Sequence, residues 1–399
     1  MPLSLLSYGR QMIDEDDIAS VSAVLRGDWL TTGPAVESFE KMLAREVGAK
    51  HAVVCNSGTA ALYLALRASN LEPGDAVIVP SITFVATASA AILAGLEVVF
   101  ADVDPETGLM YTEHAANALR REAKLRVKAI LPVHLAGRVA DPPALYAFAK
   151  ERSLAVIEDA CHALGTRYGN GACRVGGCDH GLAACFSFHP VKSIAMGEGG
   201  AVTTNSLAVA KRVRLLRNHG MSKEPGAMVN RDLAFAADGT LNPWYYEVAE
   251  PSHNFRASDI NCALGLSQLQ KLGTFLAVRR RLIARYAVRL AALSPTVRLI
   301  QASPGTEPGW HLCAVLVDFD HLGIERRELV ARLKARGVGT QVHYIPVHKQ
   351  PFYRRRYGEI DLPGAWDFYR RTLTLPLFAA MSEADVDRVV DALTESIAD

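Results

Sequence analysis

Short apolar runs alternate with amphipathic stretches along the N-terminal half of the chain. The apolar runs are partly β-branched, as buried strands are, and they lie at residues 52–55, 76–79, 97–100, 127–133 and 154–157. Helical spacing of apolar residues separates them, at residues 60–67, 84–94, 112–122 and 143–151. This alternation predicts an α/β fold with a mostly parallel central sheet and helices on both faces, to which residues 183–188 and 201–204 add strands.

Further helices are predicted at both ends of this region, at residues 13–27, 36–47, 257–272 and 275–294. Residues 222–250 mix Pro, Gly, Asn and charge without a period, so we expect a long loop there. The remainder, 297–399, predicts two or three strands and two helices. We therefore expect a large domain over 1–272 and a smaller C-terminal α+β domain over 273–399.

The bulk composition excludes several classes of function. Of 399 residues, 50% are hydrophobic and 21% charged, and the net charge of +1 offers no field for nucleic acid or an anionic membrane. We see no signal peptide and no run of membrane-spanning length, and expect a soluble, cytoplasmic protein. The seven cysteines are scattered with no C-x-x-C pair, which indicates reduced thiols and no metal site.

Lys192 is the most informative residue of the chain. It stands among small and apolar residues, ahead of a Gly-rich turn. Burial disfavours the ammonium form, so a lysine in such a place can act as a free amine and attack a carbonyl. The alternative is an ordinary exposed lysine.

Two other patterns complement this lysine. Asp159 falls at the carboxyl end of the strand predicted at 154–157, where open α/β sheets bind ligands. Ser57, Gly58 and Thr59 form a tight turn before a helix, where backbone N–H groups bind anions. Each could instead be ordinary helix capping. Together, a lysine amine, a carboxylate for the ring nitrogen and a phosphate cradle are what pyridoxal 5′-phosphate (PLP) requires.

The motifs of this chain resemble those of the DegT/DnrJ/EryC1/StrS family of sugar aminotransferases. The resemblance implies the aspartate-aminotransferase fold (fold type I) and extends nearly end to end. It rests on residues 30–34 (LTTGP), 56–62 (NSGTAAL), 158–159 (ED), 187–200 (SFHPVKSIAMGEGG), 254–256 (NFR) and 343–348 (HYIPVH).

This resemblance implies roles for further residues. His162 would bind the cofactor's phenolic oxygen, Phe84 would stack on its ring, and Ser187 would reach the phosphate or substrate. Asn254 would cross a dimer interface to the neighbour's phosphate. His162 and Phe84 could instead be core residues, and Asn254 a helix cap. The residues that match substrate-binding stretches are Tyr8, Trp29, Leu30, Thr31, Thr32, Trp310, His311, Leu312 and Cys313.

Residues 8–11, 187–192, 243–247 and 343–353 are most similar to family members of the pseudaminic acid pathway. The implied reaction transfers an amino group from L-glutamate to C4 of a UDP-4-keto-6-deoxy-N-acetylhexosamine, in a homodimer with shared active sites. Another nucleotide-sugar 3- or 4-aminotransferase, acting on a dTDP- or GDP-linked keto sugar, is the alternative. Lys192 disfavours a PLP-dependent sugar dehydratase, because His replaces the lysine in such relatives. The intact set of Lys192, Asp159 and Ser57-Gly58-Thr59 disfavours a non-catalytic regulator.

Overall fold

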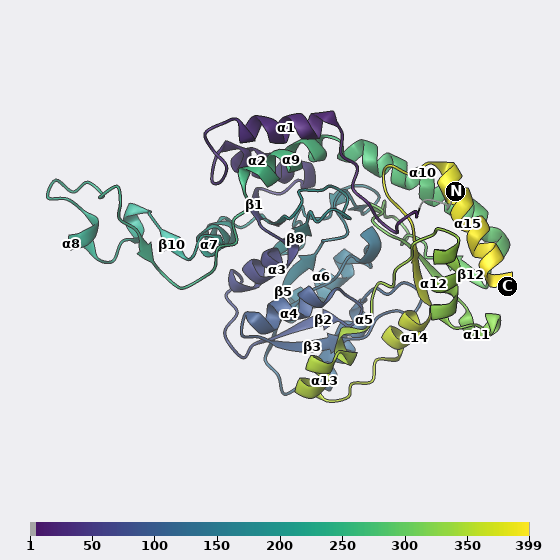
Figure 1. Cartoon of the computed structure of the whole chain (residues 1–399). Coiled ribbons are helices and arrows are strands. Elements are labelled where there is room, and N and C mark those ends of the chain that lie inside the picture. Colours follow the sequence, from purple (N-terminus) through teal and green to yellow (C-terminus); the bar gives the residue numbers. More distant parts are fainter. Residues whose placement is uncertain (1–4, 399) are drawn as a thin grey trace.

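A computed structural model describes residues 5–398 of the chain (Figure 1). Within these residues the central sheet has seven strands. In spatial order they are β1 (His51–Cys55), β9 (Gly200–Thr204), β8 (Ala183–Ser187), β5 (Ala155–Asp159), β4 (Val127–Ile130), β2 (Ala76–Pro80) and β3 (Glu97–Ala101).

The strands from β8 to β3 are parallel, as the alternating pattern predicts. Strand β9 is the exception, because it runs antiparallel to both of its neighbours, β1 and β8. It returns directly from the loop that holds Lys192, and a loop between adjacent antiparallel strands needs no crossover helix. The expectation of a mostly parallel sheet is confirmed.

Helices flank the sheet and begin where the sequence supplies caps. Asp14 forms a capping box with Asp17, and Ser57 accepts a hydrogen bond from the Ala60 N–H. No helix within residues 5–398 is both long and apolar enough to span a membrane. The helices around the sheet are α1 (Glu15–Leu25), α2 (Pro34–Val47), α3 (Gly58–Arg67), α4 (Val85–Leu93), α5 (Thr112–Arg121), α6 (Pro142–Glu151), α7 (Leu207–Arg217) and α9 (Asp259–Gln270).

The two faces of the sheet bury different cores, because successive strand residues point to opposite sides. In β1, Val53 and Cys55 pack into a cluster with α3, α4 and α7. Ala52 and Val54 pack into a second cluster with α2 and α9. The sheet is therefore covered on both faces, as predicted.

The C-terminal part of the chain builds a third core around an antiparallel sheet. It holds more helices than the two that we expected, because several are short and arginine-rich and lack a long apolar stripe. Its elements are α10 (Leu272–Leu290), β12 (Val297–Leu299), β13 (Cys313–Val317), α11 (Phe319–Leu322), α12 (Arg326–Ala335), α13 (Pro351–Tyr357), α14 (Pro363–Arg371), β14 (Thr372–Leu375) and α15 (Glu383–Ala398). The division of the chain at residue 272 stays a prediction.

Residues 221–250, which we call the arm, project from the body of the molecule beyond α7 (Figure 1). The arm is largely irregular, but β10 (Met221–Ser222) pairs with β11 (Glu247–Val248), and α8 (Arg231–Ala234) lies between them. Trp244 is 73% exposed on the arm and Val229 is 82% exposed. A second small pair, β6 (Arg167–Tyr168) and β7 (Cys173–Arg174), lies after β5.

Asp259 joins the start of α9 to the start of α2, and its loss should destabilise the fold. Its carboxylate accepts hydrogen bonds from the Gly33 N–H at 2.7 Å and the Ala35 N–H at 2.9 Å. Asp259→Ala should lower the free energy of unfolding by roughly 2–4 kcal/mol, because two N–H donors lose their acceptor. Thermal unfolding measures this, with Asp259→Asn as an intermediate control that keeps one oxygen. An unchanged melting temperature for Asp259→Ala would contradict the assignment.

Candidate active site

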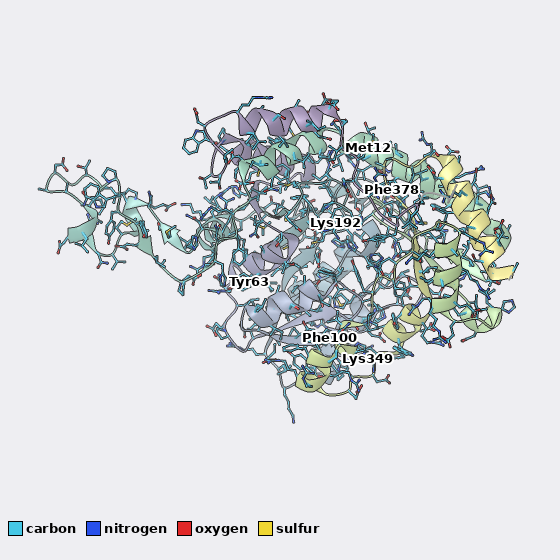
Figure 2. All side chains as sticks on the ribbon, in the orientation of Figure 1. Met12, Tyr63, Phe100, Lys192, Lys349 and Phe378 are labelled. Carbon is cyan, nitrogen blue, oxygen red and sulfur yellow. The ribbon has the colours of Figure 1, made fainter. Side chains whose placement is uncertain are left out.

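Lys192 lies in the loop between β8 and β9, and Figure 2 shows it in the middle of the molecule. The loop is folded tightly on itself. The Lys192 N–H donates to the His189 carbonyl at 2.8 Å, and the Met196 N–H donates to the Phe188 carbonyl at 2.9 Å. Asn261 of α9 donates its side-chain amide to the Met196 carbonyl at 2.6 Å. The partly buried lysine is therefore held by both the sheet and α9.

Asp159 is the last residue of β5 and is only 5% exposed. One oxygen, Oδ1, accepts from the Cys161 N–H at 3.2 Å, and the other, Oδ2, accepts from the Thr87 hydroxyl at 2.6 Å. Burial lowers the pKa of Lys192, while the nearby Cys161 and Asp159 act in the opposite direction. The amine of Lys192 is thus more readily deprotonated than that of an exposed lysine, although the charge of Asp159 favours its protonated form.

The turn at Ser57, Gly58 and Thr59 packs closely against Ser187, Cys161 and Gly200. A Cβ on Gly58 would lie 2.7 Å from the Ser187 Cβ and 3.2 Å from the Cys161 sulfur, so glycine is required there. A Cβ on Gly200 would lie 2.2 Å from the Ser57 carbonyl oxygen. Thr59 is exposed in the first turn of α3. The N-terminus of α3 therefore opens beside Ser187, as an anion site requires.

His162 is buried beneath the site and contacts Tyr344. Its Nδ1 accepts from the Ala136 N–H at 3.3 Å, and its Nε2 lies 3.1 Å from the Tyr344 hydroxyl. The neutral ring with Nδ1 as acceptor carries its proton on Nε2, so Nε2 donates to Tyr344. Burial, Lys192 and His343 together place the pKa of His162 well below its usual value. The imidazole is therefore neutral.

Two more histidines lie in the same place. The ring of His311 is 4.4 Å from that of His162, and the ring of His343 is 4.7 Å from that of Tyr344. Burial lowers the pKa of His343 to about 3, with a contribution from Lys192, and burial also lowers that of His311. The neutral imidazoles of His162, His311 and His343 thus all lie close enough to Lys192 for its charge to lower their pKa values. Tyr8 lies 5.5 Å from His343, ring to ring.

Phe84 precedes α4 and is 54% exposed. Its ring lies 5.9 Å from that of Tyr344, and its carbonyl oxygen lies 3.2 Å from the hydroxyl oxygen of Thr87, which also contacts Asp159. The alternative of a buried core residue is therefore wrong. An exposed aromatic ring beside a buried carboxylate suits the stacking of a planar ligand.

The two predicted substrate-binding stretches, 29–32 and 310–313, differ in exposure. Residues 29–32 are exposed beside the start of α9, where the Asp259 N–H donates to the Leu30 carbonyl at 3.0 Å. Trp310, Leu312 and Cys313 are buried, and Cys313 belongs to the C-terminal core, which leaves it no open face for a substrate. In that stretch, burial lowers the pKa of His311, and the positive charge of Lys192 contributes to this shift.

Asn254 is exposed at the base of the arm. Its carbonyl accepts from the Asn56 side-chain amide at 3.4 Å, so it lies beside the anion turn of its own chain. Ser258 is the N-cap of α9, because its side chain accepts a hydrogen bond from the Asn261 N–H. Asn254 is therefore not the cap of that helix.

Sequence reasoning assigned no role to Thr87, Cys161 or Tyr344. Thr87 lies in a helix of small residues, where a threonine carries no signal of its own. Cys161 stands in the same motif as Asp159, and Tyr344 in the HYIPVH motif, so closer attention to those motifs would have found them.

These groups fit PLP. Lys192 would bond to the aldehyde, Asp159 would bind the ring nitrogen, and the start of α3 with Ser187 would hold the phosphate. The fold, which is that of the aminotransferases, and this set of side chains define a PLP-dependent transferase.

The chain belongs to the DegT/DnrJ/EryC1/StrS aminotransferase family, which matches residues 11–394. It is a sugar aminotransferase, and its cofactor is PLP. It is 39% identical over 397 residues to the spore coat polysaccharide biosynthesis protein SpsC of Bacillus subtilis (strain 168), covering 98% of this chain and 97% of that protein.

Solved structures match over nearly the whole chain. Helicobacter pylori PseC, described as an aminotransferase involved in the biosynthesis of pseudoaminic acid, superposes with a TM-score of 0.88 at 29% identity, covering 99% of this chain and 100% of that one. DesI, solved in the presence of its TDP-sugar product, gives a TM-score of 0.86 at 31% identity, covering 100% of this chain and 94% of that one.

The neutral histidines predict a loss of stability in mild acid. The pKa of His343 lies below its ordinary 6.5 in the folded state, so the unfolded chain binds protons that the folded chain does not. Its contribution is complete above pH 6.5 and is lost as the pH falls towards about 3. Between pH 6.5 and 5.5 this one histidine should cost about 1 kcal/mol.

Melting temperatures of the wild type and His343→Gln, measured from pH 7.5 to 5.5, test this. The variant should lose less stability over that range, because glutamine can still bond to Thr374 but does not titrate. Parallel curves for the two proteins would show that His343 is already protonated in the fold.

Proposed function

We propose that the protein transfers the amino group of L-glutamate to C4 of a UDP-linked 4-keto-6-deoxy-N-acetylhexosamine, in the biosynthesis of pseudaminic acid. The observation that carries this proposal is the contact between Tyr8 and His343, whose rings lie 5.5 Å apart. It joins the two stretches, 8–11 and 343–353, that most resemble pseudaminic acid enzymes, beside Lys192. The likeness to PseC over the whole chain supports the same substrate.

Each residue of the site has a defined task in this reaction. PLP, when bound, supplies an electron sink for the bond broken at the donor's Cα. The amine of Lys192 would take the proton from that Cα and deliver a proton at C4′ of bound PLP, and in the second half-reaction it would move a proton in the reverse direction. Burial suits it to this work, because its lowered pKa leaves more of it as free amine. Asp159 keeps the ring nitrogen protonated.

A second candidate is a different nucleotide sugar, with a dTDP or GDP carrier and amination at C3 or C4. SpsC, at 39% identity, is named for spore coat polysaccharide, and DesI was solved with a TDP-sugar product. The chemistry at Lys192 and Asp159 would be unchanged. The difference would lie in the residues that contact the sugar and nucleotide.

The proposal includes a homodimer with shared active sites. The arm exposes Trp244 and Val229, and apolar side chains so exposed on a projecting segment favour burial against another surface. Asn254 is exposed where the arm rejoins the body, in a position to reach a neighbouring chain. We infer that this neighbour is a second copy, whose phosphate site Asn254 would complete.

A panel of keto sugars tests the substrate. The enzyme is incubated with L-glutamate and UDP-, dTDP- or GDP-linked 3-keto and 4-keto sugars, and the products are identified by mass spectrometry. We expect the UDP-4-keto-6-deoxy-N-acetylhexosamine to be aminated at C4. Lys192→Ala should lose roughly 10³-fold or more in rate, while Lys128→Ala, at an exposed lysine of β4, should not. Activity confined to a dTDP-3-keto sugar would move the protein to the second candidate.

Mixed dimers test the shared site. If Asn254 acts across the interface, a hybrid of a Lys192→Ala chain and an Asn254→Ala chain has one site with both defects and one with none. Random mixing makes about half of the dimers hybrid, so refolded mixtures should recover roughly a quarter of the wild-type activity.

The mixing test requires Asn254→Ala alone to be severely impaired, which the loss of a charge-assisted hydrogen bond to phosphate would cause. If Asn254 served its own chain, every site of the hybrid would carry one defect. Mixtures no more active than the separate variants would then overturn the shared site.

A further inference from the structure

Two buried threonines form a chain of hydroxyl groups that ends on Asp159. The Thr87 Oγ1 lies 2.6 Å from the Asp159 Oδ2, and the Thr83 Oγ1 lies 2.7 Å from the Thr87 Oγ1. Both threonines are buried at the start of α4, next to Phe84. These two hydroxyls therefore approach the Asp159 carboxylate from the start of α4, which contributes no other polar group to that carboxylate.

The number of hydroxyl protons decides which group donates in each of these hydrogen bonds. Each hydroxyl has one proton to donate, and Thr87 has three oxygen neighbours: Asp159, Thr83 and, at 3.2 Å, the Phe84 carbonyl. An ionised carboxylate only accepts, and charge-assisted bonds are the shorter and stronger ones. Thr87 therefore donates its hydroxyl proton to the Asp159 carboxylate, and Thr83 donates its own proton to the Thr87 oxygen.

The other groups that face Asp159 come from several elements. The Cys161 N–H donates to Oδ1, so each carboxylate oxygen receives one donor from the protein. Burial, together with the charge of Asp159, raises the pKa values of Cys161, Cys185 of β8 and Tyr344. The thiols and the phenol therefore stay neutral, and the hydrogen bonds from the Thr87 hydroxyl and the Cys161 N–H stabilise the carboxylate.

We propose that Thr87, oriented by Thr83, is a positioning residue that keeps the proton between Asp159 and the cofactor on the ring nitrogen. A hydrogen bond donated to a carboxylate lowers its affinity for a proton. With the Thr87 hydroxyl in place, Asp159 stays an anion and the ring nitrogen keeps its positive charge. Without it, the proton shifts towards the carboxylate and the ring draws fewer electrons from the donor's Cα. This inference depends on the cofactor and holds for any sugar substrate.

The test compares Thr87→Val, which removes the hydroxyl at nearly constant shape, with Thr87→Ser, which keeps it. The first measurement is the visible absorbance of the PLP-loaded protein as a function of pH. We expect the midpoint to rise by about one pH unit in Thr87→Val, because a less positive ring makes the imine nitrogen of Lys192 more basic. The serine variant should restore the wild-type midpoint.

The second measurement is the single-turnover reaction with L-glutamate alone. Thr87→Val should slow it by roughly ten- to a hundredfold, as the loss of a hydrogen bond to a charged group would, with a smaller change in KM. Thr83→Val leaves Thr87 in place and should shift both quantities in the same direction by less. It also keeps the test open if Thr87→Val folds poorly.

Thr203→Val is the matched control. Thr203 is as deeply buried as Thr87, but its hydroxyl donates to the Gly176 carbonyl at 2.8 Å. It should leave the absorbance midpoint unchanged. The proposal is overturned if Thr87→Val and Thr83→Val keep the wild-type midpoint and rate, if Thr203→Val shifts the midpoint as much, or if Thr87→Ser fails to restore it.

Discussion

The parallel pairing of β5 with β8 is the interaction on which the site depends. Asp159 is in register with Cys185, and the Ala160 N–H donates to the Cys185 carbonyl at 2.9 Å. Because β8 ends at Ser187, two residues beyond Cys185, the carboxylate lies near the start of the loop that holds Lys192. Strand β9 then returns from this loop and brings Gly200 against the anion turn at Ser57. Three groups far apart in sequence thus meet at one edge of the sheet.

Burial is the main cause of the lowered pKa values of the three histidines in the site. His162, His311 and His343 all have lowered pKa values, and each therefore offers a neutral ring. Neutral rings can orient Tyr344 and one another without competing with the cofactor for Asp159. The charge of Lys192 changes as its amine takes up and releases a proton during the reaction. Burial lowers the pKa of this amine and so favours its neutral form.

Much of this architecture is predictable from local patterns. The strands β1, β2, β3 and β5 lie in short apolar runs. Asp159 ends a strand and Lys192 follows one, each in a recognisable motif. The direction of β9 was not predictable, because an apolar run has no direction. His311 and Tyr344 lie far along the chain from Lys192, and tertiary packing alone brings them near it. Thr87 was missed because its partner, Asp159, is distant in sequence.

Helix α10 links the sheet to the C-terminal core. Its first turns, at Leu272 and Phe275, pack with the sheet, and its later turns, at Tyr286 and Leu290, pack in the C-terminal core. At 19 residues it is a rod of about 28 Å. Hinges need a few residues that absorb large backbone changes, and an unbroken helix offers none along its length. Any change in how the C-terminal core sits against the sheet therefore has to be absorbed outside the 19 residues of α10.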